Sequence, residues 1–249
     1  MTARRTERVI GSAIDVLGWD EAVQRLGAWS REHASRVICI CNAHSLVTAR
    51  QDPAFADVLR QAEMCTPDGA PVAWMLRRLG HADQARINGP DLMWRYCAWA
   101  AANGESIYLY GGTAETLALL QQKLLAAFPG LRIAGAFSPP FRALSDAEDA
   151  AAVAAINASG AGTVWVSLGC PKQELWMQAH RGRVQAAMLG VGAAFDYHAG
   201  TIGRAPLWAQ RAGLEWLHRL ASEPRRLWRR YLVTNTLFVW AAARQLLRR

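Results

Sequence analysis

The strongest constraint on the fold is a repeated alternation of short apolar runs with segments of helical periodicity. The apolar runs are VICIC (37–41), SIYLYG (106–111), TVWVSL (163–168) and AAMLGVG (186–192). Uninterrupted apolar strands are typical of parallel sheets that are buried on both faces. The intervening helical segments supply the crossovers that parallel strands need. The alternation therefore predicts an α/β fold, with a mainly parallel sheet covered by helices on both faces.

The positive charge of the chain is concentrated at its C-terminal end. The 249 residues carry a formal net charge of +8, and residues 204–249 hold ten arginines, no lysine and two glutamates. The charge of this tail therefore equals that of the whole chain, and the preceding body is neutral. The change in composition predicts an α/β core over residues 1–197 and a basic, amphipathic helical appendage over residues 198–249.

The tail favours anionic partners, which include a membrane surface, a phosphorylated ligand and nucleic acid. Its last helical segment has an apolar stretch, residues 231–243, which is shorter than the roughly 20 residues needed to span a bilayer. Arginines flank the stretch, and Trp228 and Trp240 lie in the segment. This pattern is typical of a helix in a membrane interface. A groove on a partner protein, or packing on the body itself, is the alternative.

Composition also bears on the compartment and on metals. The five cysteines are an odd number without paired metal-ligand spacing, which favours a reducing, cytoplasmic location. The N-terminal segment lacks the apolar run of a signal peptide. Histidines show no HExxH pattern and there is no Asp-x-Asp sequence, so we expect neither a metal site nor a cofactor.

Asp68 is the first candidate catalytic residue. It follows a short predicted strand and precedes a predicted helix, within the sequence Pro67-Asp68-Gly69-Ala70-Pro71. A carboxylate on such a stiff turn can accept a proton from a substrate hydroxyl. Asp is also a common helix N-cap, and the spacing by itself favours that structural role.

Two further strand ends are candidate binding loops. Residues 169–174 offer Lys172 and Gln173 just before a helix predicted at 174–180, a setting suited to phosphate or sugar hydroxyls. Gly111 and Gly112 end another strand, where glycines permit close approach of backbone N–H groups to a diphosphate. A plain turn explains the two glycines slightly better, and the lysine loop lacks the glycine spacing of a nucleotide P-loop.

The tail arginines form a further candidate site. Arginine binds phosphate through two parallel hydrogen bonds, so a diphosphate or a lipid headgroup is the expected ligand. A solvated helix face is the usual explanation of a charge run. Interleaving with Trp208, Trp216 and Trp228 favours function instead, and the arginines concerned are Arg204, Arg211, Arg225, Arg226, Arg229 and Arg230.

Several of these segments together resemble the WecG/TagA/CpsF family of bacterial glycosyltransferases. They occur in order over nearly the whole chain, as PDGAPV, RINGPDL, YLYGG, GCPKQE, GVGAAFD and RAPLWAQRAGLEWLHRLASEPRRLWRRY. The resemblance implies a Rossmann-like core and a C-terminal appendage that helps close the site. It also implies a metal-independent, inverting transfer from a UDP-sugar to an undecaprenyl-diphosphate-linked sugar, by a peripheral protein on the inner face of the cytoplasmic membrane.

The resemblance assigns roles to individual residues. Asp68 matches the general base and Asn42 a residue of the pocket wall, and His44 replaces an acidic residue found in many relatives. Arg86 and Gln173 match pocket residues that contact the substrates. The arginines that match the region contacting the UDP diphosphate are Arg204, Arg211, Arg219 and Arg226.

The sugar and the competing functions are less constrained. Relatives transfer N-acetylmannosamine or glucose. The segment RINGPDL, with Asn88 and Pro90, favours glucose in exopolysaccharide synthesis. A basic nucleic-acid-binding protein is one alternative, although the body offers no reading helix or aromatic sheet platform. A non-catalytic membrane scaffold for polysaccharide assembly is another, and homo-oligomerisation stays open.

Overall fold

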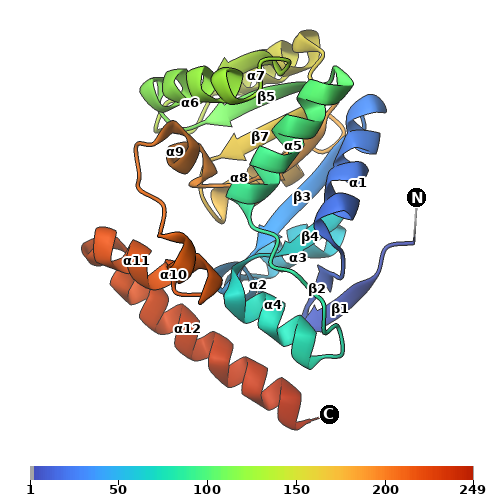
Figure 1. Ribbon diagram of the computed structural model, residues 1–249. Helices are drawn as coiled ribbons and strands as arrows, with labels where there is room; N and C mark the ends of the chain where they lie inside the picture. Colours follow the sequence, from blue (N-terminus) through green and yellow to red (C-terminus); the bar gives the residue numbers. More distant parts are fainter. Residues whose placement is uncertain (1–2, 249) are drawn as a thin grey trace.

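A six-stranded sheet forms the centre of the computed structural model, which describes residues 3–248 except for the side chains of Arg211, Arg226 and Arg230 (Figure 1). Its strand order is β4-β3-β8-β7-β5-β6, and every neighbouring pair is parallel. The strands are β3 (Arg36–Cys41), β4 (Met64–Pro67), β5 (Ser106–Gly111), β6 (Arg132–Phe137), β7 (Thr163–Ser167) and β8 (Ala187–Gly190). The predicted α/β fold with a parallel sheet is confirmed.

Helices cover both faces of this sheet, and each face has its own apolar core. Along β3, Val37 and Cys39 point into one core, whereas Ile38 and Ile40 point into the other, as the two-residue period of a strand requires. One face is covered by α1 (Trp19–Arg31), α5 (Gly89–Asn103), α6 (Ala114–Ala127) and α9 (Ala194–Ala199). The other is covered by α2 (Ala43–Gln51), α3 (Pro53–Gln61), α4 (Gly69–Arg78), α7 (Asp146–Ser159) and α8 (Lys172–Ala179).

Helix caps follow several strands directly and bring polar residues to the carboxyl edge of the sheet. Asn42 caps α2 by accepting a hydrogen bond from the Ser45 N–H at 3.2 Å. The loop residue Asn88 caps α5 in the same way, and Asp68 caps α4 by accepting from the N–H of the next residue, Gly69. A side-chain oxygen at this position satisfies an N–H group that the helix leaves unpaired. The same chemistry that starts the helices therefore places functional groups at one edge.

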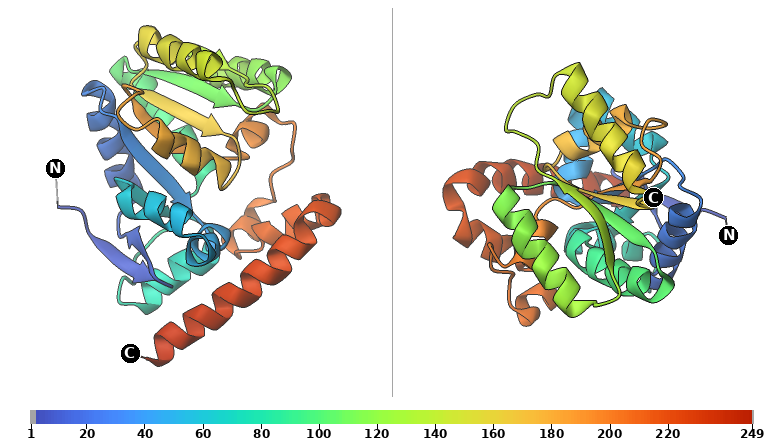
Figure 2. Two further views of the ribbon diagram at one scale, coloured as in Figure 1. Left: turned by 180° about the vertical axis from the view of Figure 1, so that it is seen from behind. Right: turned by 90° about the horizontal axis from the view of Figure 1, so that it is seen from above.

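The C-terminal appendage packs against the body. Its helices are α10 (Leu207–Arg211), α11 (Glu215–Ser222) and α12 (Pro224–Leu247). Helix α12 packs against α2, as the view from behind shows (Figure 2, left). Phe238, Ala241 and Ala242 of α12 belong to the buried core. The sequence alternative of packing on the body therefore holds for one face of this helix, and the boundary predicted after Tyr197 falls within α9.

The opposite face of α12 is open. Leu232, Val233, Val239 and Trp240 are each more than half exposed. In the described part of the chain, no helix has the length and apolarity that a membrane span requires. The end of α12 lies beside a two-stranded antiparallel hairpin, β1 (Thr6–Val9) and β2 (Ser12–Asp15).

Candidate active site

Asp68 and Asn42 lie side by side because their strands, β4 and β3, are neighbours. The Asp68 N–H donates to the carbonyl oxygen of Cys41 at 2.9 Å, which extends the ladder by one residue. The Asp68 carboxylate accepts a hydrogen bond from the Gly69 N–H at 2.5 Å and another from the Asn42 side chain. The N-cap role of Asp68 is confirmed, and the same contacts hold its half-buried carboxylate in a fixed orientation.

The surroundings of Asp68 make it a stronger base than an ordinary aspartate. Burial is the main cause, and it raises the pKa of the carboxyl above its usual value because a charge is costly to remove from water. The positive charge of Arg86 opposes this shift, whereas the negative charge of Glu215 adds to it. Charged groups of both the body and the tail therefore affect the pKa of Asp68.

An ion-pair network joins the appendage to the body beside Asp68. Arg86 donates to Glu215 at 2.8 Å, and Arg204 reaches the other oxygen of the same carboxylate at 3.4 Å. Arg204 also pairs with Asp91 at 2.6 Å, which in turn accepts from the Asn88 amide at 2.7 Å. The loop before α5 and the first turn of α11 are therefore held together by alternating charges.

One atom of this network has no partner. The Arg204 Nη2 is buried and makes no hydrogen bond with any described residue. A guanidinium group can donate five hydrogen bonds, so Arg204 keeps capacity for a further acceptor. An anionic ligand at this edge can supply that acceptor.

Close backbone packing brings the appendage onto the start of α4. Gly213, in the turn between α10 and α11, has a φ of +73°, and a Cβ atom there would lie 2.7 Å from the Cβ of Ala70. Only glycine combines this left-handed conformation with so close an approach. The turn therefore covers the chain two residues beyond Asp68, and the tail forms one wall of the site.

Arg219 is the other tail arginine whose side chain the structure places near this wall. Its guanidinium lies 6.0 Å from the ring centroid of Tyr197, and its Nε is buried without a hydrogen-bond partner among residues 3–248. The side chains of Arg211 and Arg226, which the sequence also assigns to the diphosphate, fall outside the described part.

The sequence matches the model of the glycosyl transferase WecG/TagA/CpsF family over residues 7–249. This range includes the sheet, the strand-end loops and the appendage that closes over them. The chain belongs to the WecG/TagA/CpsF family. It is therefore a glycosyltransferase for cell-surface polysaccharide, and the edge that holds Asp68 is its candidate active site.

Gln173 of this glycosyltransferase lies near the carboxyl ends of β7 and β8. Helix α8 begins at Lys172, two residues earlier than predicted, so Gln173 is in its first turn. The Gln173 side chain is buried, donates to Glu174 at 2.9 Å and accepts from the Gly192 N–H at 3.1 Å. It thereby fixes the loop after β8, whereas Lys172 is exposed and pairs with no described residue. Substrate contact by either residue stays a prediction.

Gly111 and Gly112 serve the turn between β5 and α6. A Cβ on Gly111 would lie 2.3 Å from the Ser167 carbonyl oxygen, so only glycine fits beside β7. The Gly112 N–H donates to that same oxygen at 3.1 Å and is not directed to a ligand. These contacts support the turn interpretation, and diphosphate contact by the glycines stays a prediction.

Sequence reasoning missed three residues of the glycosyltransferase site: Glu215, Asp91 and Gly213. Glu215 offers a signal, because it is one of two acids in a tail of ten arginines. Asp91 looks like an ordinary N-terminal helix residue, and Gly213 like an ordinary turn.

No group of three His, Cys, Asp or Glu side chains within residues 3–248 is arranged to hold a metal ion.

Proposed function

We propose that this glycosyltransferase moves a hexose, glucose in preference to N-acetylmannosamine, from a UDP-sugar to an undecaprenyl-diphosphate-linked sugar. The proposed reaction is inverting and metal-independent, and it takes place on the inner face of the cytoplasmic membrane. One observation carries the proposal: a fixed carboxylate of raised pKa, Asp68, lies at the strand edge near Arg86 of the body and Glu215 of the tail. Glu215 pairs with both Arg86 and the tail residue Arg204.

In the proposed step, Asp68 removes the proton of the acceptor hydroxyl. The hydroxyl oxygen forms a bond to the anomeric carbon on the face opposite UDP, and the bond from that carbon to the diphosphate oxygen breaks. UDP leaves with the bonding electron pair. A base is needed at the first oxygen and positive charge at the second.

Arg86 and Arg204 are the cations best placed to receive the diphosphate. Both are held by Glu215 in this structure, and Arg204 retains an unpaired N–H donor. A diphosphate can replace Glu215 at these guanidinium groups, because phosphate oxygens accept the same paired hydrogen bonds as a carboxylate. Arg211, Arg219 and Arg226 extend this cationic wall in our proposal.

The appendage also supplies the proposed contact with the membrane. Leu207 and Trp208 of α10 and Leu232, Val239 and Trp240 of α12 are more than half exposed. Tryptophan and leucine beside arginine are typical of helices in a membrane interface. An acceptor with a lipid tail could then be reached without leaving the bilayer.

Substitution of the base tests the proposal. Because a general base contributes roughly 10²- to 10⁴-fold to rate, we expect Asp68→Asn to lower the transfer rate by about that factor. Asp52→Asn is the matched control, since Asp52 also caps a helix, α3, where its side chain accepts from the N–H groups of Ala54 and Phe55. Retention of more than about a tenth of the wild-type rate in folded Asp68→Asn would remove Asp68 from this role.

A panel of UDP-sugars tests the substrate. The purified protein is incubated with each donor and a lipid-diphosphate-linked sugar, and the product is identified by mass. Transfer of glucose is expected, and transfer of N-acetylmannosamine alone would overturn the choice of sugar. No transfer from any donor would favour the non-catalytic scaffold.

The pH dependence of turnover tests the state of Asp68. The base must be ionised, and its pKa is raised above the usual value for aspartate. The acid limb of the rate profile is therefore expected at higher pH than for an exposed aspartate. An acid limb at or below the ordinary aspartate pKa contradicts this assignment.

A further inference from the structure

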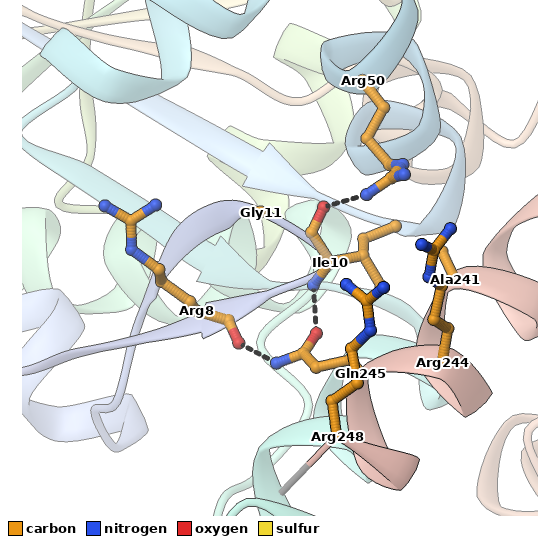
Figure 3. Close-up of a pocket in the computed structure, with 8 residues that line it drawn as sticks. All are labelled: Arg8, Ile10, Gly11, Arg50, Ala241, Arg244, Gln245 and Arg248. Carbon is orange, nitrogen blue, oxygen red and sulfur yellow. Dashed lines mark hydrogen bonds between the residues drawn. The ribbon is translucent and has the colours of Figure 1, made fainter.

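A basic pocket lies away from the candidate active site, where the end of α12 meets the β1–β2 hairpin (Figure 3). Its cavity measures about 470 Å³, within the usual range for small-ligand sites. Three separate segments line it. The lining residues are Arg8, Ile10, Gly11, Arg50, Ala241, Arg244, Gln245 and Arg248.

Specific hydrogen bonds fix the shape of this pocket. The Gln245 side chain donates to the Arg8 carbonyl oxygen at 2.6 Å and accepts from the Ile10 N–H at 2.7 Å. Arg50 donates to the Ile10 carbonyl oxygen at 3.2 Å. Helix α12, helix α2 and the hairpin are therefore joined around the Ile10–Gly11 turn.

The arginines of this pocket lack acidic partners. Among the described residues, no carboxylate pairs with Arg8, Arg50, Arg244 or Arg248, and no Asp or Glu lines the cavity. Figure 3 shows the guanidinium groups of Arg50, Arg244 and Arg248 on one side of the hairpin turn, whereas that of Arg8 points away. Like charges repel when they are gathered without a counter-ion.

Helix stabilisation does not account for the whole cluster. Cations near a helix C-terminus interact favourably with its dipole, which explains Arg244 and Arg248 at the end of α12. Arg50 belongs to α2, and its guanidinium lies on the same side of the hairpin turn as those of Arg244 and Arg248 (Figure 3). The dipole of α12 does not explain the position of Arg50, and three guanidinium groups from two helices are placed to share one ligand.

We propose that this pocket binds a phosphate group, as a phosphomonoester or a phosphodiester. Arginine matches phosphate oxygens through paired hydrogen bonds. Val239, Trp240 and Leu247 of the adjoining α12 face are 64%, 56% and 87% exposed, so a phospholipid headgroup is the favoured source and a soluble phosphate ester is the other. The lipid source rests on the proposed membrane location, whereas phosphate binding itself does not depend on sugar transfer.

The test compares two charge-matched double variants of the full-length protein. Arg50→Gln/Arg244→Gln removes two charges from the pocket. Lys123→Gln/Arg132→Gln removes two charges from exposed positions on α6 and β6, and β6 is the sheet edge opposite β4. Binding is measured by sedimentation with phosphatidylglycerol-containing vesicles, with pure phosphatidylcholine vesicles, and by calorimetric titration with glycerol 3-phosphate.

The pocket variant is expected to bind phosphatidylglycerol vesicles about tenfold more weakly than the matched control. Loss confined to vesicles identifies a lipid headgroup, and loss of glycerol 3-phosphate binding identifies a soluble ester. Equal behaviour of the two variants in both measurements overturns the proposal. If the pocket variant fails to fold, the same binding measurements are made with Arg248→Gln. The Arg248 side chain makes no hydrogen bond to the described residues, so its substitution leaves the fold intact.

Discussion

Two groups of arginines in this protein differ in what surrounds them. Arg86 and Arg204, at the carboxyl edge of the sheet, share Glu215, and Arg204 also pairs with Asp91. Arg50 and Arg244, at the far end of α12, line a cavity without any carboxylate from the described residues. The first pair is half-buried, whereas the second is exposed.

The difference shows that burial determines whether an arginine needs a fixed counter-charge. A half-buried guanidinium group needs a fixed counter-charge when its ligand is absent, since desolvation is otherwise uncompensated. An exposed guanidinium group is solvated by water, so it needs no fixed counter-charge when its ligand is absent. The two sites are therefore expected to respond differently to the same substitution.

Among variants of the two groups of arginines, the largest effect is expected from removing one paired arginine. Arg204→Gln takes away a donor for the diphosphate and leaves Asp91 without its cation. We expect the transfer rate to fall by about 10²- to 10³-fold, the usual cost of one donor to a developing charge. Arg50→Gln is the control, and its rate with a soluble acceptor analogue should stay within about twofold of wild type. Similar losses in both variants would erase the distinction between the two groups.

A buried carboxylate with no cationic partner among the described residues provides the converse case. Glu174 is almost fully buried, and burial raises its pKa to about 7. Because the folded protein then holds a proton that the unfolded chain releases, stability falls as the pH rises from about 4.5 to about 7. Relative to Glu174→Gln, the wild-type free energy of unfolding should drop by up to about 3 kcal/mol across this range. Urea unfolding at several pH values measures it, and parallel curves would contradict the assignment.

Glu215→Gln tests whether the tail carboxylate competes with the UDP diphosphate for Arg86 and Arg204. Neutralising it frees Arg86 and Arg204, so we expect UDP to bind about twofold to fivefold more tightly, which corresponds to the free energy of one partly exposed ion pair. Calorimetric titration with UDP provides the measurement. Weaker binding would mean that Glu215 organises the arginines for the ligand instead of competing with it.

The smallest effect is expected on the stability of Asp68→Asn. Burial raises the pKa of Asp68, so the ionised carboxylate costs stability at neutral pH, and this cost is lost only as the pH falls through the folded pKa. Asparagine also caps helices and carries no charge. The Tm of the variant at pH 7.5 should therefore equal or slightly exceed that of wild type. A clear decrease would show that the carboxylate is stabilising.

Much of the fold and part of the site follow from local sequence. VICIC and TVWVSL form strands of a parallel sheet, as predicted, because an uninterrupted apolar run needs cover on both faces. The structure shows that both strands pair with β8. Asn42 and Asp68 meet because the ends of neighbouring parallel strands share an edge. Helix α8 begins two residues before its predicted start, since periodicity defines helix ends less well than helix centres.

The sequence by itself determined the parallel sheet, the polar strand ends, the family and the concentration of charge in the tail. Tertiary structure alone decided which arginines are paired and which face of α12 is buried. Arg86 and Glu215 are separated by 129 positions along the chain, and Gly213 contacts Ala70 across a similar separation. Strand and helix patterns depend on a few neighbouring residues, whereas these contacts depend on the path of the whole chain.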